Sequence, residues 1–198
     1  YIAINPEIKL PESNRLNNWL YSKSKAKPLR LRLIGDLESP KYKSLFLRPE
    51  ITYNLYDGIS PGVNFLNKGI KNRPFSYEVF TQYSSNEQTL IGSLNLRYQI
   101  NNETENNYSS IFNLIYTTNH YNENLRYQVF SPSILINYRD NTNLRSNIKK
   151  SISLSMFNVN KQNNINTENS LDKYSVFNLG YYYSDVGIIK YLKSSINS

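Results

Sequence analysis

The feature that most constrains the fold is an alternation of apolar and polar residues along most of the chain. In LFLRPEITYNLY, residues 45–56, apolar side chains fall mainly on one parity and polar ones on the other, and stretches 75–83, 90–100 and 150–157 repeat the pattern. Successive side chains of a β-strand point to opposite faces, so a period of two indicates strands. Less regular strand candidates lie at 109–118, 125–138, 174–184 and 187–193. The sequence predicts an all-β chain of about nine strands with a hairpin near its middle third.

That hairpin lies in YNLYDGISPGVNFLN, residues 53–67. Asp57-Gly58 is a pair that closes tight turns, because glycine accepts a positive φ without steric cost. We interpret Asp57 as a turn residue. The connections partly alternate in length: YDG and SSNE are short, whereas NKGIKNR, NNETENN and RDNTNLRSN are longer and polar. Short turns on one side and long loops on the other are typical of outer-membrane barrels, although the long stretch 161–173 departs from this rule.

Strand length and tyrosine content bear on the environment of these strands. A membrane-crossing strand needs about 9–11 residues, whereas strands of soluble proteins usually have about 5–6. The 18 tyrosines suit a boundary between lipid and water, where barrels carry aromatic girdles. These observations favour an antiparallel up-and-down transmembrane β-barrel, whole or partial, with about nine long strands after a short N-terminal lead-in. Its natural setting would be a bacterial outer membrane.

A soluble, tyrosine-rich β-sandwich or barrel that binds a ligand such as a glycan is the alternative. The placement of tyrosines distinguishes the two. Girdle tyrosines belong near strand ends on the apolar parity, as Tyr53 and Tyr98 do, whereas sugar-binding tyrosines would gather on one polar face. Tyr181, Tyr182 and Tyr183 occupy both parities and fit neither arrangement.

The charged residues of the best strands fall on the polar parity. In a barrel that parity would line the lumen, and a charge on the other face would cost about 2–4 kcal/mol at the bilayer midplane. The lumen-facing candidates are Arg48, Glu50, Glu78, Asn95 and Arg97. The lipid-facing candidates are Leu45, Leu47, Ile51, Tyr53, Leu94, Leu96, Ile152 and Leu154. We interpret the lumen charges as pairing across strands, and a soluble core would exclude charges from its apolar face as well.

Composition limits the chemistry available to the chain. It contains no cysteine and a single histidine, His120, which lies in the Asn-rich stretch TTNHYNENL and is interpreted as a solvated loop residue. Thiolate chemistry and a two-histidine metal site are therefore excluded. The net charge of +8 is concentrated in residues 21–33, where five basic residues occur without an acid. Aromatic residues are not interleaved with LRLRL, so nucleic-acid binding is not predicted. No catalytic residue, metal or cofactor is predicted, and no run of roughly eighteen apolar residues could form a transmembrane helix.

Residues 27–98 resemble a known family. The elements are KPL, DLESP, a strand ending in YNLYDG, a strand ending in LNKG, then RPFSYEVFTQYS and LIGSLNLRY, with YSVFNLGYYYSDVGIIKY near the end of the chain. They resemble the C-terminal outer-membrane β-barrel region of Bacteroidota proteins in the aminopeptidase-like (gluzincin) metallopeptidase family. The resemblance implies a barrel that anchors an upstream domain of the same polypeptide and that uses the lipid bilayer and the barrel-assembly machinery as partners. The peptidase chemistry requires H-E-x-x-H, which is absent here, so no catalytic residue carries over.

The expected organisation has two parts. Residues 1–40 are predicted to be a linker or lead-in with a short helix around 14–21, and residues 41–198 to be the β-barrel domain. The odd strand number and the ending KYLKSSINS, which lacks a terminal aromatic residue, suggest a truncated barrel. Proline interrupts strand ladders, so Pro49, Pro61, Pro74 and Pro132 are predicted to lie at rims or bulges, with one bulge at 131–133.

Overall fold

The computed structural model describes residues 1–12, 15, 17–21, 26–33, 39–67, 73–102, 106–140, 147–163, 172–186 and 191–197. The described residues form strands and connections without any helix, which confirms the all-β prediction. The strands are β1 Ile2–Ala3, β2 Trp19–Leu20, β3 Leu29–Leu33, β4 Lys43–Asn54, β5 Gly58–Leu66, β6 Phe75–Tyr83, β7 Leu90–Asn101, β8 Asn107–Asn122, β9 Leu125–Tyr138, β10 Ile148–Lys161, β11 Asp172–Val186 and β12 Tyr191–Asn197.

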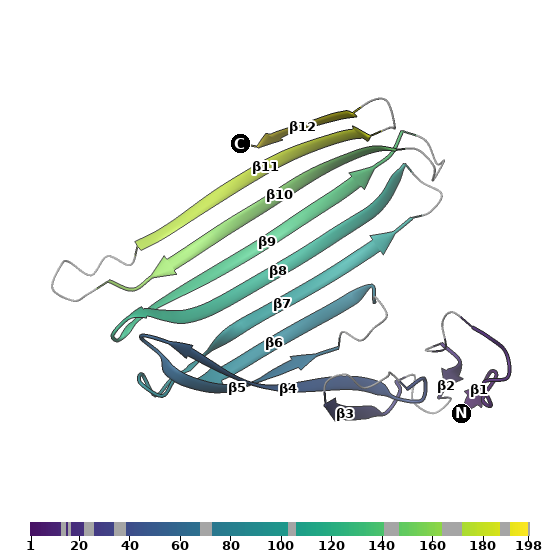
Figure 1. Cartoon of the computed structure of the whole chain (residues 1–198), viewed down its shortest axis with the longest axis horizontal. Coiled ribbons are helices and arrows are strands. Elements are labelled where there is room, and N and C mark those ends of the chain that lie inside the picture. The colour runs from purple at the N-terminus through teal and green to yellow at the C-terminus, as the bar shows by residue number, and fades with distance from the viewer. Residues whose placement is uncertain are drawn as a thin grey trace.

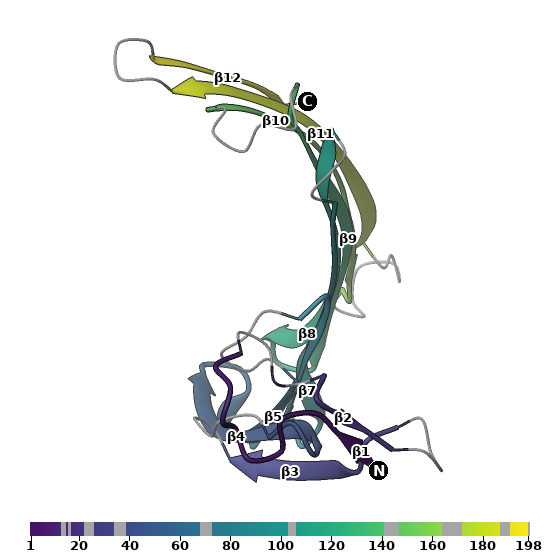
Figure 2. The ribbon, with the colours of Figure 1, turned by 90° about the vertical axis from the view of Figure 1, so that its right-hand side faces the viewer.

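Ten strands make one large sheet in the order β12-β11-β10-β9-β8-β7-β6-β5-β4-β3 (Figure 1). Strands β4 to β12 pair antiparallel with their sequence neighbours, as the alternating pattern predicts. Strand β3 instead pairs parallel with β4, so the sheet is mixed and the purely antiparallel prediction needs this correction. The sheet bends into an arc (Figure 2), and no pairing in the described part of the chain joins its edge strands β3 and β12.

The connections of the meander lie on two opposite rims (Figure 1). We name the turn rim after the ends of β4, β6, β8 and β10, and the loop rim after the ends of β5, β7, β9 and β11 together with the entry into β4. The short YDG and SSNE turns thus lie at one rim, and the strand ends that flank the longer polar stretches lie at the other, as predicted. The strand ends that flank the long stretch 161–173 lie at the turn rim and are the exception.

The lead-in differs from the prediction in two ways. Strand β3 lies within residues 1–40 and belongs to the large sheet. The stretch 14–21 was predicted as a short helix, but its described residues contain a turn at Asn17 and strand β2, which pairs with β1. Residues 14 and 16 lie outside the described part. The ring of Tyr1 packs 4.9 Å from that of Trp19, and this contact favours strand pairing over a helix.

Three of the four prolines do not lie where they were predicted. Pro49, Pro61 and Pro132 sit inside strands β4, β5 and β9, and only Pro74 lies at a rim. The bulge predicted at 131–133 is also wrong, because the β8–β9 register is continuous there and the β9–β10 ladder lacks pairs opposite Pro132 without shifting. Proline has no N–H to donate, so a local loss of pairing suffices. The register shifts of β8 lie instead near its two ends.

Candidate functional site

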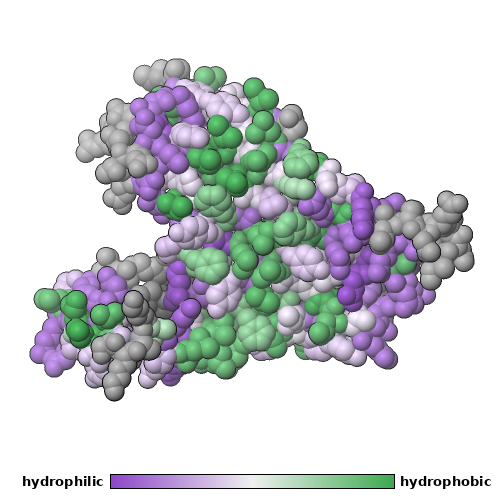
Figure 3. Space-filling view, turned by 180° about the vertical axis from the view of Figure 1, so that it is seen from behind, coloured by the Kyte–Doolittle hydropathy of each residue, from purple (hydrophilic) through white to green (hydrophobic). Residues whose placement is uncertain are grey.

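The strand register divides the residues of the large sheet between two faces, since directly paired residues point to the same side. One row across six strands is Leu47, Phe65, Val79, Leu94, Tyr116 and Phe130, all apolar or aromatic. A second row is Tyr98, Phe112, Ile134, Leu154 and Leu179. These rows lie on the convex face of the arc, where hydrophobic residues gather in the middle of the sheet (Figure 3).

The pattern of burial is the reverse of that in a soluble protein, which buries apolar side chains and exposes polar ones. On the convex face Ile51, Tyr53 and Leu90 are 76%, 74% and 68% exposed. On the concave face the small polar side chains of Ser60 and Asn64 are 1% and 2% exposed. Apart from Trp19, Phe46 and Ile91, the buried side chains of the described residues are polar or charged. The arc therefore shields a polar interior and leaves a large apolar surface uncovered.

The apolar band of the convex face stops before the turn rim in strands β9 to β11. There the same face carries Gln128, Asn158, Asn160, Lys173 and Ser175. Between these polar residues and the loop rim, the band in β10 runs from Ile152 to Met156 and in β11 from Phe177 to Tyr181. An apolar stripe bounded by a polar margin is the outward-facing pattern of a membrane barrel.

The register separates the two sets of sequence candidates. Leu45, Leu47, Ile51, Tyr53, Leu94, Leu96, Ile152 and Leu154 all lie on the convex face. Arg48, Glu50, Glu78, Asn95 and Arg97 all lie on the concave face. Tyr98 and Tyr53 lie on the convex face near strand ends, as do Tyr83, Tyr138 and Tyr183, whereas Tyr182 points to the concave side. Contact of the first set with lipid and of the second with a lumen remains a prediction.

Three of the concave-face charges form a network. Arg48 Nε donates to a carboxylate oxygen of Glu50, and Arg48 Nη2 lies 3.4 Å from Oε1 of Glu78. The same Glu78 oxygen accepts a hydrogen bond of 2.5 Å from Asn64 Nδ2. The cation thus bridges two carboxylates on strands β4 and β6 across the intervening β5. Pairing of charges across strands was predicted, and here it brings Arg48, Glu50 and Glu78 together.

The other two concave-face candidates lie apart from this network. Asn95 is the register partner of Glu78, and Arg97 Nη2 donates instead to Gln99 Oε1 at 2.9 Å along its own strand. A further polar contact of this face joins Gln82 Nε2 to Thr52 Oγ1 at 2.5 Å, again across β5. The concave face is therefore lined by hydrogen-bonded polar groups that tie β4 to β6.

A buried histidine–carboxylate pair lies at the turn rim. His120 Nδ1 donates to Asp57 Oδ1 at 2.5 Å, and the two side chains are 5% and 1% exposed. Asp57 Oδ2 accepts from Asn54 Nδ2 at 3.0 Å, and its backbone carbonyl accepts from Ser84 Oγ at 3.0 Å and from Asn86 N at 3.3 Å. Through these hydrogen bonds Asp57 connects the β4–β5 turn to β8 and to the β6–β7 turn.

The prediction that His120 is a solvated loop residue is wrong. It lies in β8 next to a register shift and faces a turn that is 63 residues away in sequence. Asp57 is a turn residue as predicted, but its side chain is also the hydrogen-bond partner of His120 and Asn54. A single histidine followed by asparagines gives no local signal for burial. A pairing of the only histidine with the carboxylate of the hairpin turn could have been considered from the sequence, but nothing there fixes their proximity.

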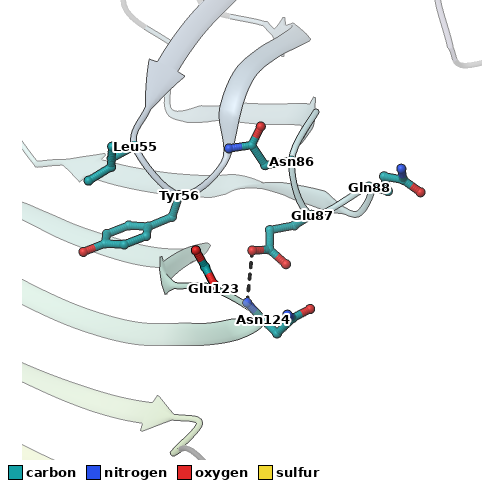
Figure 4. A pocket seen from close by; sticks show the side chains of 7 residues that line it. All are labelled: Leu55, Tyr56, Asn86, Glu87, Gln88, Glu123 and Asn124. Atoms are coloured by element: carbon teal, nitrogen blue, oxygen red, sulfur yellow. Dashed lines mark hydrogen bonds between the residues drawn. The ribbon is translucent and has the colours of Figure 1, made fainter.

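A pocket of about 780 Å³ lies beside the Asp57–His120 pair at the turn rim (Figure 4). Its lining comes from the three tight turns: Leu55, Tyr56, Asn86, Glu87, Gln88, Glu123 and Asn124. The backbone N–H of Asn124 donates to Glu87 Oε1 at 3.0 Å, which links the β6–β7 and β8–β9 turns. Within the described ranges, no group of three or more His, Cys, Asp or Glu side chains could hold a metal ion.

Comparison with protein-family models, with curated proteins and with solved structures found no match to this chain. The described residues contain no helix that is long and apolar enough to span a membrane. The function is therefore inferred from the strand register and the burial pattern of the sheet.

Proposed function

We propose that this chain is a membrane-embedded β-barrel region of an outer-membrane protein and that it anchors an upstream domain of the same polypeptide. The observation that carries the proposal is the inverted burial of the sheet, with Ser60 and Asn64 shielded while Ile51 and Tyr53 are uncovered. Water would penalise an uncovered apolar surface that crosses so many strands, and exposed patches of this kind mark contact with another apolar phase. Lipid supplies that phase.

Closure of the sheet is part of the proposal. An open strand edge cannot persist in the hydrocarbon region, because its N–H and C=O groups would lack partners. Strands β3 and β12 are the edges of the arc, so each needs a strand partner in the membrane. Direct pairing of β3 with β12, or pairing with strands outside the described residues, would join the two edges. The polar concave face, with its Arg48 network, would then line a lumen.

The upstream domain would be metallopeptidase-like. This part of the proposal rests on the resemblance of residues 27–98 to the Bacteroidota metallopeptidase-associated barrels. The proposed role of this chain is mechanical, since the H-E-x-x-H motif that the peptidase chemistry requires is absent from it. Assembly would use the barrel-assembly machinery.

Refolding with and without detergent micelles tests the proposal. We expect far-UV circular dichroism of β-structure and a heat-modifiable shift on cold SDS gels only when micelles are present, because the convex face needs an apolar solvent. A monomer that folds in plain buffer would contradict the membrane assignment. That outcome would favour the soluble, ligand-binding alternative, and a glycan site should then be sought.

A further inference from the structure

Basic residues from separate segments meet at the corner of the sheet where β3 and β4 begin, on the loop rim. Lys27 Nζ donates to the carbonyl of Pro40 at 2.8 Å, and the N–H of Lys43 donates to the carbonyl of Pro28 at 2.9 Å. These contacts hold the entries to β3 and β4 side by side. Lys27, Arg30, Lys41 and Lys43 therefore lie within one corner.

Arg73, from the loop before β6, adds a fifth positive charge to this corner. Burial lowers the pKa of Lys27, and the nearby Arg73 guanidinium lowers it further. A neighbouring cation depresses the pKa of a lysine because it disfavours a second positive charge. The Arg73 guanidinium therefore lies close enough to Lys27 for the two charges to interact.

Aromatic rings hold two of the cations in place. The ammonium group of Lys41 lies 4.7 Å from the ring centre of Trp19, and the guanidinium of Arg30 lies 5.3 Å from that of Tyr42. Tyr21 Oη donates to the carbonyl of Lys41 at 3.0 Å. Tryptophan and tyrosine favour the level of lipid headgroups, because they combine an apolar ring with a polar tip.

The uncovered apolar face adjoins this cationic corner directly. Leu29, Leu31 and Leu33 of β3 are 63%, 59% and 69% exposed, and Leu31 is the register partner of Leu45 on the convex face. Lys43, the register partner of Leu29, lies on the same convex face at the loop-rim end of these leucines. Arg30 and Arg32 occupy the alternate positions of β3 and point to the concave side. A lipid presents the same arrangement as the leucines and Lys43, with an acyl chain that ends at a charged headgroup.

The three tight turns of the opposite rim differ from this corner in charge, because they carry the acids Asp57, Glu87 and Glu123 and no lysine or arginine. Resting on the membrane function proposed above, we propose that the corner formed by Lys27, Lys41, Lys43 and Arg73 is a binding surface for the phosphate-bearing headgroups of anionic membrane lipids. The acyl chains of these lipids would pack on Leu29, Leu31 and Leu33.

The only tryptophan of the chain, Trp19, is a built-in reporter because Lys41 lies over its ring. The full chain is reconstituted in phosphatidylcholine vesicles that contain a small fraction of one brominated lipid, either phosphatidylglycerol or phosphatidylcholine, with bromine near the headgroup end of the acyl chain. Anionic lipid gathered at the corner will quench Trp19 about two- to fivefold more than neutral lipid at equal mole fraction. High salt will abolish the difference by screening.

The double variant Lys41→Gln, Lys43→Gln should remove the preference for the anionic lipid. The matched variant Lys161→Gln, Lys173→Gln loses the same charge at the turn rim and should keep the preference. Equal quenching by the two lipids in the unaltered chain, or a preference that survives the first variant, would overturn the headgroup surface while leaving the membrane assignment standing. Absence of quenching by either lipid would contradict both.

Discussion

Asp57 and His120 are joined through Oδ1 and Nδ1 at 2.5 Å although 63 residues separate them in the sequence. One comes from the turn after β4 and the other from the end of β8. Both side chains are almost completely shielded from solvent. The pair therefore joins the turn after β4 to β8 at the turn rim. Asp57 also accepts hydrogen bonds from Asn54 and Ser84 in the neighbouring turns.

Replacement of either partner should destabilise the protein substantially. In Asp57→Ala the buried imidazole and the amide of Asn54 lose their acceptor, and a buried donor left unsatisfied costs about 1–3 kcal/mol. We expect a loss of this size in the free energy of unfolding by urea in micelles. The variant His120→Ala should cost a similar amount, and the double variant should cost clearly less than the sum.

Glu123→Gln is the matched control for this pair, since Glu123 is an exposed carboxylate on the same rim. It should leave stability nearly unchanged. Additive effects of Asp57→Ala and His120→Ala would mean that the two side chains do not interact in solution.

Leu94 and Asn95 are neighbours in β7 that point to opposite faces of the sheet. If the convex face contacts lipid, Leu94→Arg places a charge in the hydrocarbon region and should cost about 2–4 kcal/mol. Asn95→Arg enters the polar concave side and should cost much less. Unfolding titrations of the two variants in lipid vesicles measure the difference. Equal costs would contradict a lipid-facing convex surface.

Gly92 has a φ of 151°, and a Cβ built on it would lie 2.0 Å from the backbone carbonyl oxygen of Phe80. Backbone atoms of the β6–β7 ladder cannot move aside, so Gly92→Ala should destabilise the sheet by about 1–3 kcal/mol. Gly180→Ala is a useful comparison, because its Cβ would meet the hydroxyl of Ser153 and the amide of Asn197, which are side-chain ends that can rotate. Thermal unfolding of both variants should rank Gly92→Ala as clearly worse.

Glu12 gives the lead-in a defined pH response. Hydrogen bonds from the side-chain amides of Asn18 and then Asn5 lower the pKa of Glu12 below its ordinary value. A lowered pKa means that the stabilising contribution is complete above the ordinary glutamate pKa and disappears as the pH falls through the lowered folded-state pKa. Trp19 follows Asn18 directly, so its fluorescence should report local loosening in this acid range.

The variant Glu12→Gln should remove that acid transition, whereas Glu7→Gln should retain it. Glu7 is the appropriate control because it is a carboxylate of the same lead-in that pairs with Lys9 at the exposed surface. A transition that persists in Glu12→Gln would show that another group governs the lead-in.

Much of the meander was predictable because alternation in single strands is a local property. Leu125–Tyr138 was delimited correctly, and the division of charges between faces followed from parity alone. Strand β3 was missed because LRLRL sits in a basic, proline-containing stretch and pairs parallel with β4, which no turn announces. The Asp57–His120 contact was missed because it depends on how strongly the sheet bends. Bending is set by pairing across many strands and leaves no mark on either residue's neighbours.

The strands of the sheet differ greatly in length. Strands β5 and β6 have 9 residues each, whereas β8 has 16 and β11 has 15. At about 3.3 Å per residue the long strands reach about 50 Å and the short ones about 30 Å. The polar residues of β9 to β11 on the convex face lie at the turn-rim end of these long strands, outside the apolar band. In a bilayer of uniform thickness, strands β8 to β11 would extend beyond the lipid on the turn-rim side, whereas strands β4 to β6 would end at the membrane surface. The extended ends of the long strands would be exposed to water and could contact molecules of that compartment.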